Sequence, residues 1–279
     1  MSDERRRELG ESDAAIEDEL KASFDSIVRE GADRLHRTFR ATIATGLVGG
    51  LEVGTGVMAY LAVLHQTGNH LLAGLAFGVG FIALMLGHSE LFTEDFLLPI
   101  TAVVAKEASI LRLGRLWGGT LVANLVGGWV IMWLVVQAFP EWKRTIAEAA
   151  RPYVTAPLSL QTIALAVLAG SSITLMTRMR HGTTSDPAKV VAAVIGGFLL
   201  AGLGLFHSIL DSLLIFGAIH AGSDITYLQW LGWFWYTLLF NILGGVLLVT
   251  TLRLIRTKEL VKERRDEAPD DPDAPRGKD

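Results

Sequence analysis

The chain has 279 residues, 51% of them hydrophobic, and contains no cysteine. The absence of cysteine excludes disulfides, thiolate metal sites and cysteine catalysis. The net charge of −4 excludes little, because the charged residues sit mostly in the two ends and in short loops. The apolar residues instead come in blocks of about twenty or more, which a bilayer can absorb and a soluble core cannot. The composition therefore predicts an all-α membrane protein.

Residues 1–38 are rich in charge but carry Ile16, Leu20, Phe24, Ile27, Val28 and Leu35 at helical spacing. This pattern predicts an amphipathic helix, which lies either on a membrane surface or against a neighbouring protein face. No cleavable signal peptide is expected, because the first apolar block begins only near Phe39. From Thr257 to residue 279 the tail consists mainly of charged residues and proline, a composition typical of disorder.

Between these ends lies a predicted membrane domain, residues 39–256. Four of its apolar blocks suit single transmembrane helices, whereas the second and fifth are too long for one crossing and contain polar residues near their middle. Arginine and lysine are concentrated in the loops after the second and fourth blocks and at both ends of the chain. Because cytoplasmic loops carry an excess of these residues, we expect both termini on the cytoplasmic side of a bacterial inner membrane. The blocks are 39–64, 71–104, 114–138, 158–177, 188–219 and 228–255.

Two short motifs occur twice in the same order. Leu91-Phe92-Thr93 matches Leu205-Phe206-His207 at an offset of 114, and an Asn-x-x-Gly-Gly motif begins at Asn124 and again at Asn241, an offset of 117. Near-equal offsets indicate a duplicated unit of three helices. Because three is odd, the two halves must be inverted, as in many membrane carriers. We interpret the two asparagines as structural residues that bond between closely packed helices.

The second block is interrupted by Gly87-His88-Ser89-Glu90-Leu91-Phe92-Thr93-Glu94-Asp95. So many ionisable groups cannot face lipid, and unwound backbone at this depth must be buried in protein or line a wet cavity. A broken helix also presents free N–H groups, which suit an anion. The Thr93 hydroxyl can join these donors, whereas Glu90, like Glu52 in the first block, is expected to anchor the structure.

His207 is the only histidine deep in the fifth block, and two interpretations remain open. It is either a neutral core histidine or a residue that faces Thr93 across a transport path, where an imidazole could attract an anion or pass a proton. Asp211, one helical turn later, either orients the ring or caps the second half of the helix. Both roles of Asp211 stay open at this point.

Three functions fit these features. The first is a channel or proton-coupled carrier for small monovalent anions, the second a pore for neutral solutes or protonated weak acids, and the third a non-conducting membrane scaffold. An enzyme is not expected, because the chain has no nucleophile–base spacing, metal-ligand cluster or cofactor loop. No cofactor, metal or nucleic-acid partner is expected.

The segments Ser89–Thr93 and Phe206–Ile209 and the repeated Asn-x-x-Gly-Gly motif resemble signatures of the formate/nitrite transporter family, over residues 38–256. The resemblance implies an aquaporin-like protomer, a homopentamer in the lipid bilayer and one anion path per subunit. Thr93 and His207 would flank the centre of that path. Phe77 and Phe81 would form one apolar constriction, and Leu200 would form the other. The remaining residues expected along it are Leu91, Phe92, Phe206, Ser208 and Asp211.

The chain also departs from that family's pattern. An asparagine common in the fourth span is replaced by Gly170 followed by Ser171 and Ser172. A lysine is also common before this span, but none follows Lys143 there, and Val154 falls nearest its place. Asp211 stands where an asparagine is usual. Losing a cation and gaining a carboxylate lowers the positive potential that would draw in an anion.

Overall fold

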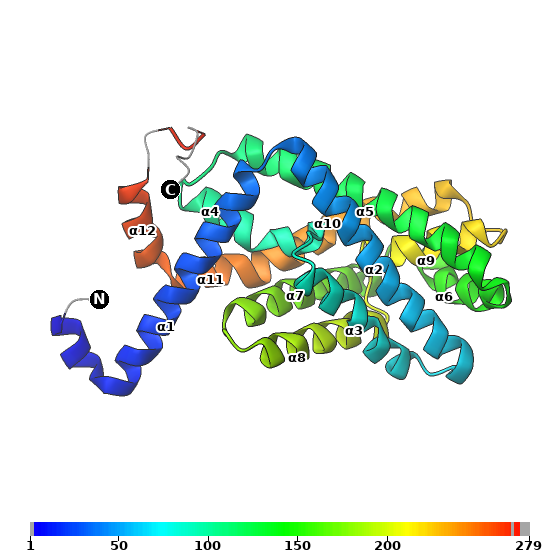
Figure 1. Ribbon diagram of the computed structural model, residues 1–279, viewed down its shortest axis with the longest axis horizontal. Helices are drawn as coiled ribbons and strands as arrows, with labels where there is room; N and C mark the ends of the chain where they lie inside the picture. Colours follow the sequence, from blue (N-terminus) through cyan, green and yellow to red (C-terminus); the bar gives the residue numbers. More distant parts are fainter. Residues whose placement is uncertain (1–2, 269–270, 274–279) are drawn as a thin grey trace.

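A computed structural model describes residues 3–268 and 271–273. Within these residues the chain forms helices and no strand, so the predicted all-α class is confirmed. The molecule is elongated, with α1 (Asp3–His36) and α12 (Lys258–Glu267) at one end and α6 (Lys143–Thr155) at the other (Figure 1). The outermost parts of the two predicted terminal segments, residues 1–2, 269–270 and 274–279, lie outside the described residues.

Four helices are long and apolar enough to cross a membrane, by length and composition. Several begin at a side-chain cap, which supplies an acceptor for the free N–H groups of the first turn. For example, Thr226 and Gln229 form a reciprocal capping box. The four are α2 (Phe39–Thr67), α5 (Ile110–Ala138), α7 (Leu160–His181) and the continuous helix Tyr227–Arg256, which comprises α10 (Tyr227–Gly245), the π-helix η4 (Val246–Thr250) and α11 (Thr251–Arg256).

The second and fifth apolar blocks are each made of shorter helical pieces with non-helical backbone between them. The second comprises α3 (His70–Leu86), the 3₁₀-helix η1 (Phe92–Phe96) and α4 (Leu98–Val104). The fifth comprises α8 (Asp186–Gly197), the π-helix η3 (Phe198–Gly202) and α9 (Leu210–His220).

Helix α3 ends at Leu86, so the first interruption begins at Gly87, the first residue of the polar segment Gly87–Asp95. The later part of that segment, including Thr93, belongs to η1. After Gly87, His88 has a left-handed φ of 53°, a conformation that cannot continue an α-helix. In the fifth block Gly204, with φ 61°, makes the corresponding turn after η3, where a side chain would be strained.

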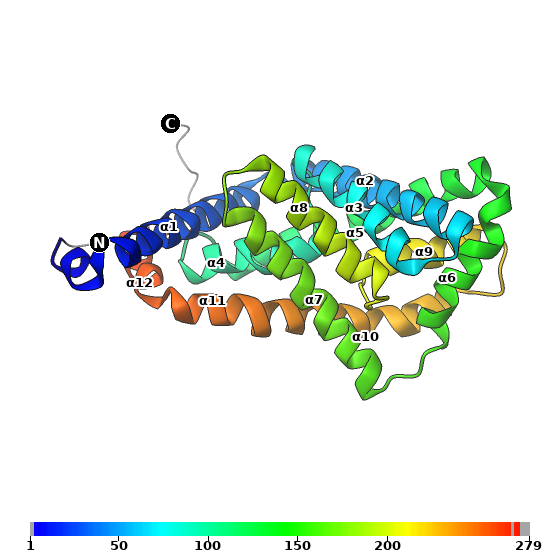
Figure 2. The same ribbon diagram turned by 90° about the horizontal axis from the view of Figure 1, so that it is seen from below.

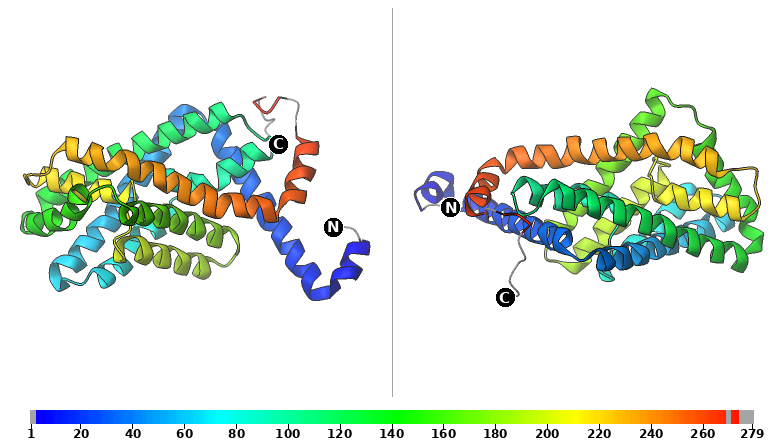
Figure 3. Two further views of the ribbon diagram at one scale, coloured as in Figure 1. Left: turned by 180° about the vertical axis from the view of Figure 1, so that it is seen from behind. Right: turned by 90° about the horizontal axis from the view of Figure 1, so that it is seen from above.

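Glycines let the long helices approach in two similar pairs, α2 with α5 and α7 with α10. A Cβ added to Gly50 would lie 2.3 Å from the carbonyl oxygen of Asn124, and one added to Gly170 would lie 1.9 Å from that of Asn241. Such close backbone contact is typical of membrane helix pairs. Figure 2 and Figure 3 show the long α10–α11 rod running the length of the helical bundle.

The amphipathic N-terminal helix predicted from the sequence packs against the protein itself. Phe24 and Val28 of α1 form a buried cluster with Ala105 and with Val261 of α12. The tail from Thr257, predicted to be disordered, is a helix over Lys258–Glu267. Ion pairs hold this end in place, Lys21 with Glu263 at 3.0 Å and Glu17 with Arg256 at 2.6 Å. The prediction of disorder, based on composition, was wrong for this helix, because α1 provides α12 with both an apolar contact and charges of opposite sign.

The loop expected between the third and fourth spans also folds. After the 3₁₀-helix η2 (Pro140–Trp142), helix α6 packs on α9. Its apolar side chains Ile146, Ala150 and Tyr153 are buried, three or four residues apart. This spacing places them on one face of the helix. The sequence analysis missed this face because charged residues separate the apolar ones.

Candidate functional site

The two interrupted blocks meet at Thr93 and His207. The Thr93 hydroxyl oxygen lies 3.0 Å from His207 Nε2, and both residues are buried. Thr93 belongs to η1, and His207 lies in the non-helical segment before α9. The two side chains, one from each interruption, were expected to face each other across a transport path, and in the structure they lie in direct contact.

The backbone around His207 fixes the role of its ring. The N–H of Leu210 donates to His207 Nδ1 at 3.1 Å, so Nδ1 is the acceptor nitrogen and carries no proton. In the neutral ring the proton then resides on Nε2, which faces Thr93. Asp211 Oδ2 accepts the His207 N–H at 2.7 Å. Of the two open roles for Asp211, this contact is the capping one, at the start of α9.

Two asparagines hold the interruptions by the same set of bonds. Asn124 Oδ1 accepts the N–H of Phe92 at 2.8 Å, and its Nδ2 donates to the carbonyl oxygens of Gly46 and Glu90. Asn241 Oδ1 accepts the N–H of Ser208 at 2.8 Å, and its Nδ2 donates to Ala166 and Phe206. Each amide thus satisfies backbone groups that a broken helix leaves free.

These bonds also correct the register of the sequence repeat. The asparagines make Glu90 equivalent to Phe206 and Phe92 equivalent to Ser208, an offset of 116 that differs by one from the asparagine offset of 117. By this correspondence His207 matches Leu91, two residues before Thr93. The Leu-Phe match at offset 114 was a coincidence of composition. His207 and Thr93 meet although they are not equivalent positions.

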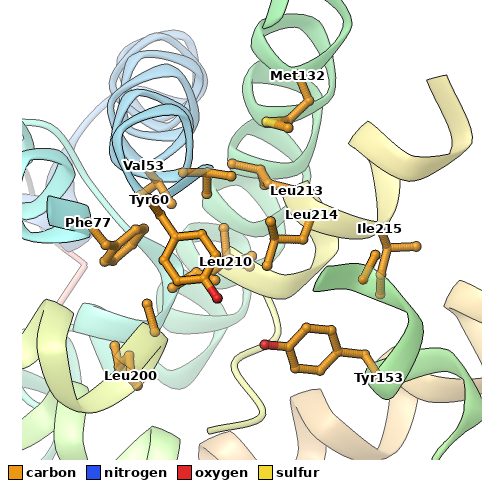
Figure 4. Packing of buried hydrophobic residues seen from close by; sticks show 14 of the residues in the cluster. Val53, Tyr60, Phe77, Met132, Tyr153, Leu200, Leu210, Leu213, Leu214 and Ile215 are labelled. Atoms are coloured by element: carbon orange, nitrogen blue, oxygen red, sulfur yellow. The ribbon is translucent and has the colours of Figure 1, made fainter. Parts of the chain in front are cut away.

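Residues next to this pair in the sequence, Leu91, Phe206 and Leu210, belong to a large buried apolar cluster. The rings of Phe77 and Phe81 are buried and stack edge to face with centroids 5.0 Å apart. Leu200 and Leu91 are buried in the same apolar cluster. Phe77, Leu200, Leu210 and Tyr60 lie around a common centre in Figure 4.

Three other predicted path residues are placed mainly by packing. The Phe92 ring contacts Phe96 and Trp117, at centroid distances of 5.2 and 5.8 Å, and so turns toward α5. The Phe206 ring packs edge to face on Tyr153 and Trp233. The Ser208 hydroxyl is buried and has no hydrogen-bond partner within the described residues.

The acidic residues of the first interruption are paired with arginines that the sequence analysis did not use. Arg34 of α1 reaches Asp95 at 3.0 Å and Glu90 at 3.7 Å, Arg37 also binds Glu90, and Arg180 of α7 binds Glu94. The three carboxylates are buried. Arg34 lies seven residues after Ile27, on the apolar stripe of α1. A lone arginine on that stripe was the available signal.

Glu52 and Glu90 both contact the first interruption, as expected of anchoring residues. Glu90 forms the ion pairs above, and Glu52 interacts with the Ser89 hydroxyl. Glu52 Oε1 would also lie 2.3 Å from a Cβ added to Gly87. The glutamate therefore packs closely against the first residue after α3.

A cavity of about 790 Å³ opens between α1, the end of α3 and the α7–α8 loop. Its wall includes acids from α1 and a basic set from the other elements, so its charge is mixed. Burial alone would raise the pKa of Glu30 in this wall, but Arg34, His181 and Arg180 together outweigh burial and lower that pKa. The other charged or titratable lining residues are Glu19, His88, Arg180, His181, Asp186 and Lys189.

Comparisons with known proteins agree with this architecture. The family model described as formate/nitrite transporter matches residues 21–255. Inner membrane protein YfdC of Escherichia coli (strain K12) is 23% identical over 274 residues, covering 94% of this chain and 86% of YfdC. The uncharacterized transporter YrhG of Bacillus subtilis (strain 168) is 19% identical over 255 residues, covering 87% of this chain and 94% of YrhG.

Two solved structures have the same fold. A pentameric formate channel with formate bound aligns with a TM-score of 0.68 and 19% identity, over 79% of this chain and 98% of that one. An ion channel of the same family aligns with a TM-score of 0.73 and 17% identity, over 84% and 98%. The family model spans most of the chain, and the fold agrees with it. The chain therefore belongs to the formate/nitrite transporter family.

Proposed function

We propose that this protein conducts small monovalent anions of weak acids, such as formate, nitrite or hydrosulfide, across a bacterial inner membrane. Six spans would form two inverted halves with an aquaporin-like protomer, and the second and fifth spans would be the interrupted ones. The matching bonds of Asn124 and Asn241 support this duplication. The arginine and lysine bias of the loops supports a topology with both termini in the cytoplasm.

The observation that carries the proposal is the contact between Thr93 and His207. It sets two hydrogen-bond donors from different interruptions 3.0 Å apart in apolar surroundings. Donors in a dry site bind an anion more strongly than donors in water. A small anion at this point can accept from the His207 Nε2–H and from the Thr93 hydroxyl.

The chemistry of an imidazole left open that His207 also passes a proton. Passing one through the ring requires that Nδ1 gain a proton, but the Leu210 N–H points at that atom. An N–H group cannot donate to a nitrogen that itself carries a proton, so a proton on Nδ1 would break the hydrogen bond from the Leu210 N–H. We therefore assign His207 the role of a neutral donor.

Uptake into proteoliposomes that contain the purified protein tests the proposal. A panel should include formate, nitrite, hydrosulfide and acetate together with glycerol and water as neutral solutes. We expect saturable uptake of the anions above the level of protein-free liposomes. Uptake confined to neutral solutes would replace the proposal by a neutral-solute pore. That alternative has one observation in its favour, because Arg180 and Lys189 in the cavity wall are both paired with carboxylates. No flux of either kind would leave a non-conducting scaffold.

We further propose a homopentamer. The solved relative titled a pentameric formate channel has the same fold, and this chain exposes large apolar side chains along its long helices, such as Val122, Trp133 and Leu252. Lipid or neighbouring subunits would cover these side chains. Native mass spectrometry in detergent should give a mass of five chains, and a monomeric or trimeric mass would contradict the proposal.

Phe81→Ala should raise flux and relax selectivity. The Phe77 and Phe81 rings would form an apolar constriction, which slows a bare anion because it strips away water. Removing one ring should increase uptake on the order of tenfold, the effect of a barrier about 1.4 kcal/mol lower. Phe139→Ala is the matched control, since that ring stacks on Trp142 and not on the Phe77–Phe81 pair. Equal uptake by Phe81→Ala and wild type would place the barrier elsewhere.

A further inference from the structure

Asp211 carries a buried carboxyl oxygen that none of the contacts above uses. Its Oδ2 accepts the His207 N–H, but its Oδ1 has no hydrogen bond within the described part of the chain. The residue is 1% exposed. No ion pair with lysine or arginine is formed by Asp211 among the described residues. An ionised carboxylate in such a place is costly, whereas a carboxyl group with a proton on Oδ1 is not.

Titratable hydroxyl groups face Asp211 from two neighbouring helices. Tyr153 of α6 interacts with the Asp211 side chain and with Tyr60 of α2. Figure 4 shows the hydroxyl groups of Tyr60 and Tyr153 directed toward one another, close to Leu210. His207 is the other titratable group beside Asp211, and its ring is already held by Leu210 and Thr93.

The tyrosines also connect Asp211 to the surface. The Tyr60 hydroxyl lies 2.8 Å from Nδ1 of His70. His70 is the first residue of α3 and is exposed. A hydroxyl group can accept a proton on its oxygen while it gives its own to the next group, so hydroxyls in series can relay a proton. The order from the surface inward is His70, Tyr60, Tyr153 and Asp211.

We propose that Asp211 is the proton-carrying group of this transporter, supplied from the surface through His70, Tyr60 and Tyr153. The inference rests on the proposed anion transport. When an anion is bound at His207 and Thr93, the O–H bond of the Asp211 carboxyl group breaks and an O–H or S–H bond forms on the anion. The neutral acid leaves, and the Asp211 carboxylate regains a proton from water through the relay. No other reactant is needed.

Asp211→Asn is the sharpest test, because the amide oxygen can still accept the His207 N–H but cannot exchange a proton. Formate uptake and internal acidification are measured together in proteoliposomes over a range of external pH. In wild type, uptake should rise as pH falls, with a proton entering for each anion. In Asp211→Asn, anion uptake should persist while its rise at low pH is lost and acidification falls to the level of protein-free liposomes. Asp224→Asn, a mostly exposed aspartate beside Arg151, should behave like wild type.

The possible outcomes separate this inference from the proposed function. Unchanged proton uptake in Asp211→Asn would overturn the role of Asp211 and leave anion transport standing. Tyr153→Phe keeps the ring and removes the hydroxyl, so it should slow acidification even if Asp211→Asn does not assemble. Infrared spectra of the protein provide a readout without transport. A carboxylic acid band that is present in wild type and absent from Asp211→Asn supports the inference, and its absence from wild type refutes it.

Discussion

His207→Asn should lower formate uptake about 10- to 100-fold, whereas His207→Gln should retain most of it. Hydrogen bonds to charged groups contribute about 1.5–3 kcal/mol, and about 1.4 kcal/mol is a tenfold change. The asparagine amide can take the place of Nδ1 and accept the Leu210 N–H, but it ends short of the Nε2 position. The longer glutamine can place a donor near Thr93.

Neither amide can exchange a proton, and this decides between the two roles of the histidine. As a neutral donor, His207 is replaceable by glutamine, and His207→Gln keeps the rise of uptake at low pH. If the proton passes through the imidazole, both variants lose that rise. A third result, loss of the assembled protein in both variants with an unaltered pH profile in the remainder, would mean that His207 is a structural residue. Uptake at several pH values, with oligomer content measured by size-exclusion chromatography, distinguishes these results.

Arg34→Met should strongly destabilise the end of the protein where α1 packs. The guanidinium group lies between Asp95 at 3.0 Å and Glu30 at 2.7 Å. Among the described residues, removing it leaves Asp95 buried without a cation in contact, because Arg37 forms its ion pair with Glu90. Removing one partner of a buried ion pair lowers the free energy of unfolding by about 3–5 kcal/mol. We expect a clearly lower unfolding temperature in detergent, followed by tryptophan fluorescence.

A second substitution tests the reason for that loss. In Arg34→Met with Asp95→Asn, the uncompensated charge is gone, and most of the stability should return. Arg144→Ala is the control, because the Arg144–Glu148 pair is exposed and such pairs contribute about 0–1 kcal/mol. An Arg34→Met protein as stable as Arg144→Ala would show that α1 does not hold the first interruption through this ion pair.

Much of the architecture follows from the sequence alone. Long apolar blocks with polar residues inside two of them predict helices and their interruptions, because a bilayer accepts only backbone whose polar groups are bonded. The pairing of Thr93 with His207 was predicted as well, although through a repeat register that the bonds of Asn124 and Asn241 correct by two residues. Hydropathy and short motifs can predict helices and their interruptions because both features depend only on residues close together in the sequence.

Only the tertiary structure decided which side chains meet across long stretches of chain. Arg34 with Asp95, Tyr153 with Asp211, and α1 with α12 each join residues tens to hundreds of positions apart. Helix α6 and helix α12 were expected to be a loop and a disordered tail, because their charged residues masked narrow apolar faces. A buried charge or hydroxyl is stable only beside a partner, and the partner's identity is fixed by packing. The sequence therefore shows that a polar residue inside this membrane protein needs a partner. The fold determines which residue that partner is, and with it the role of the polar residue.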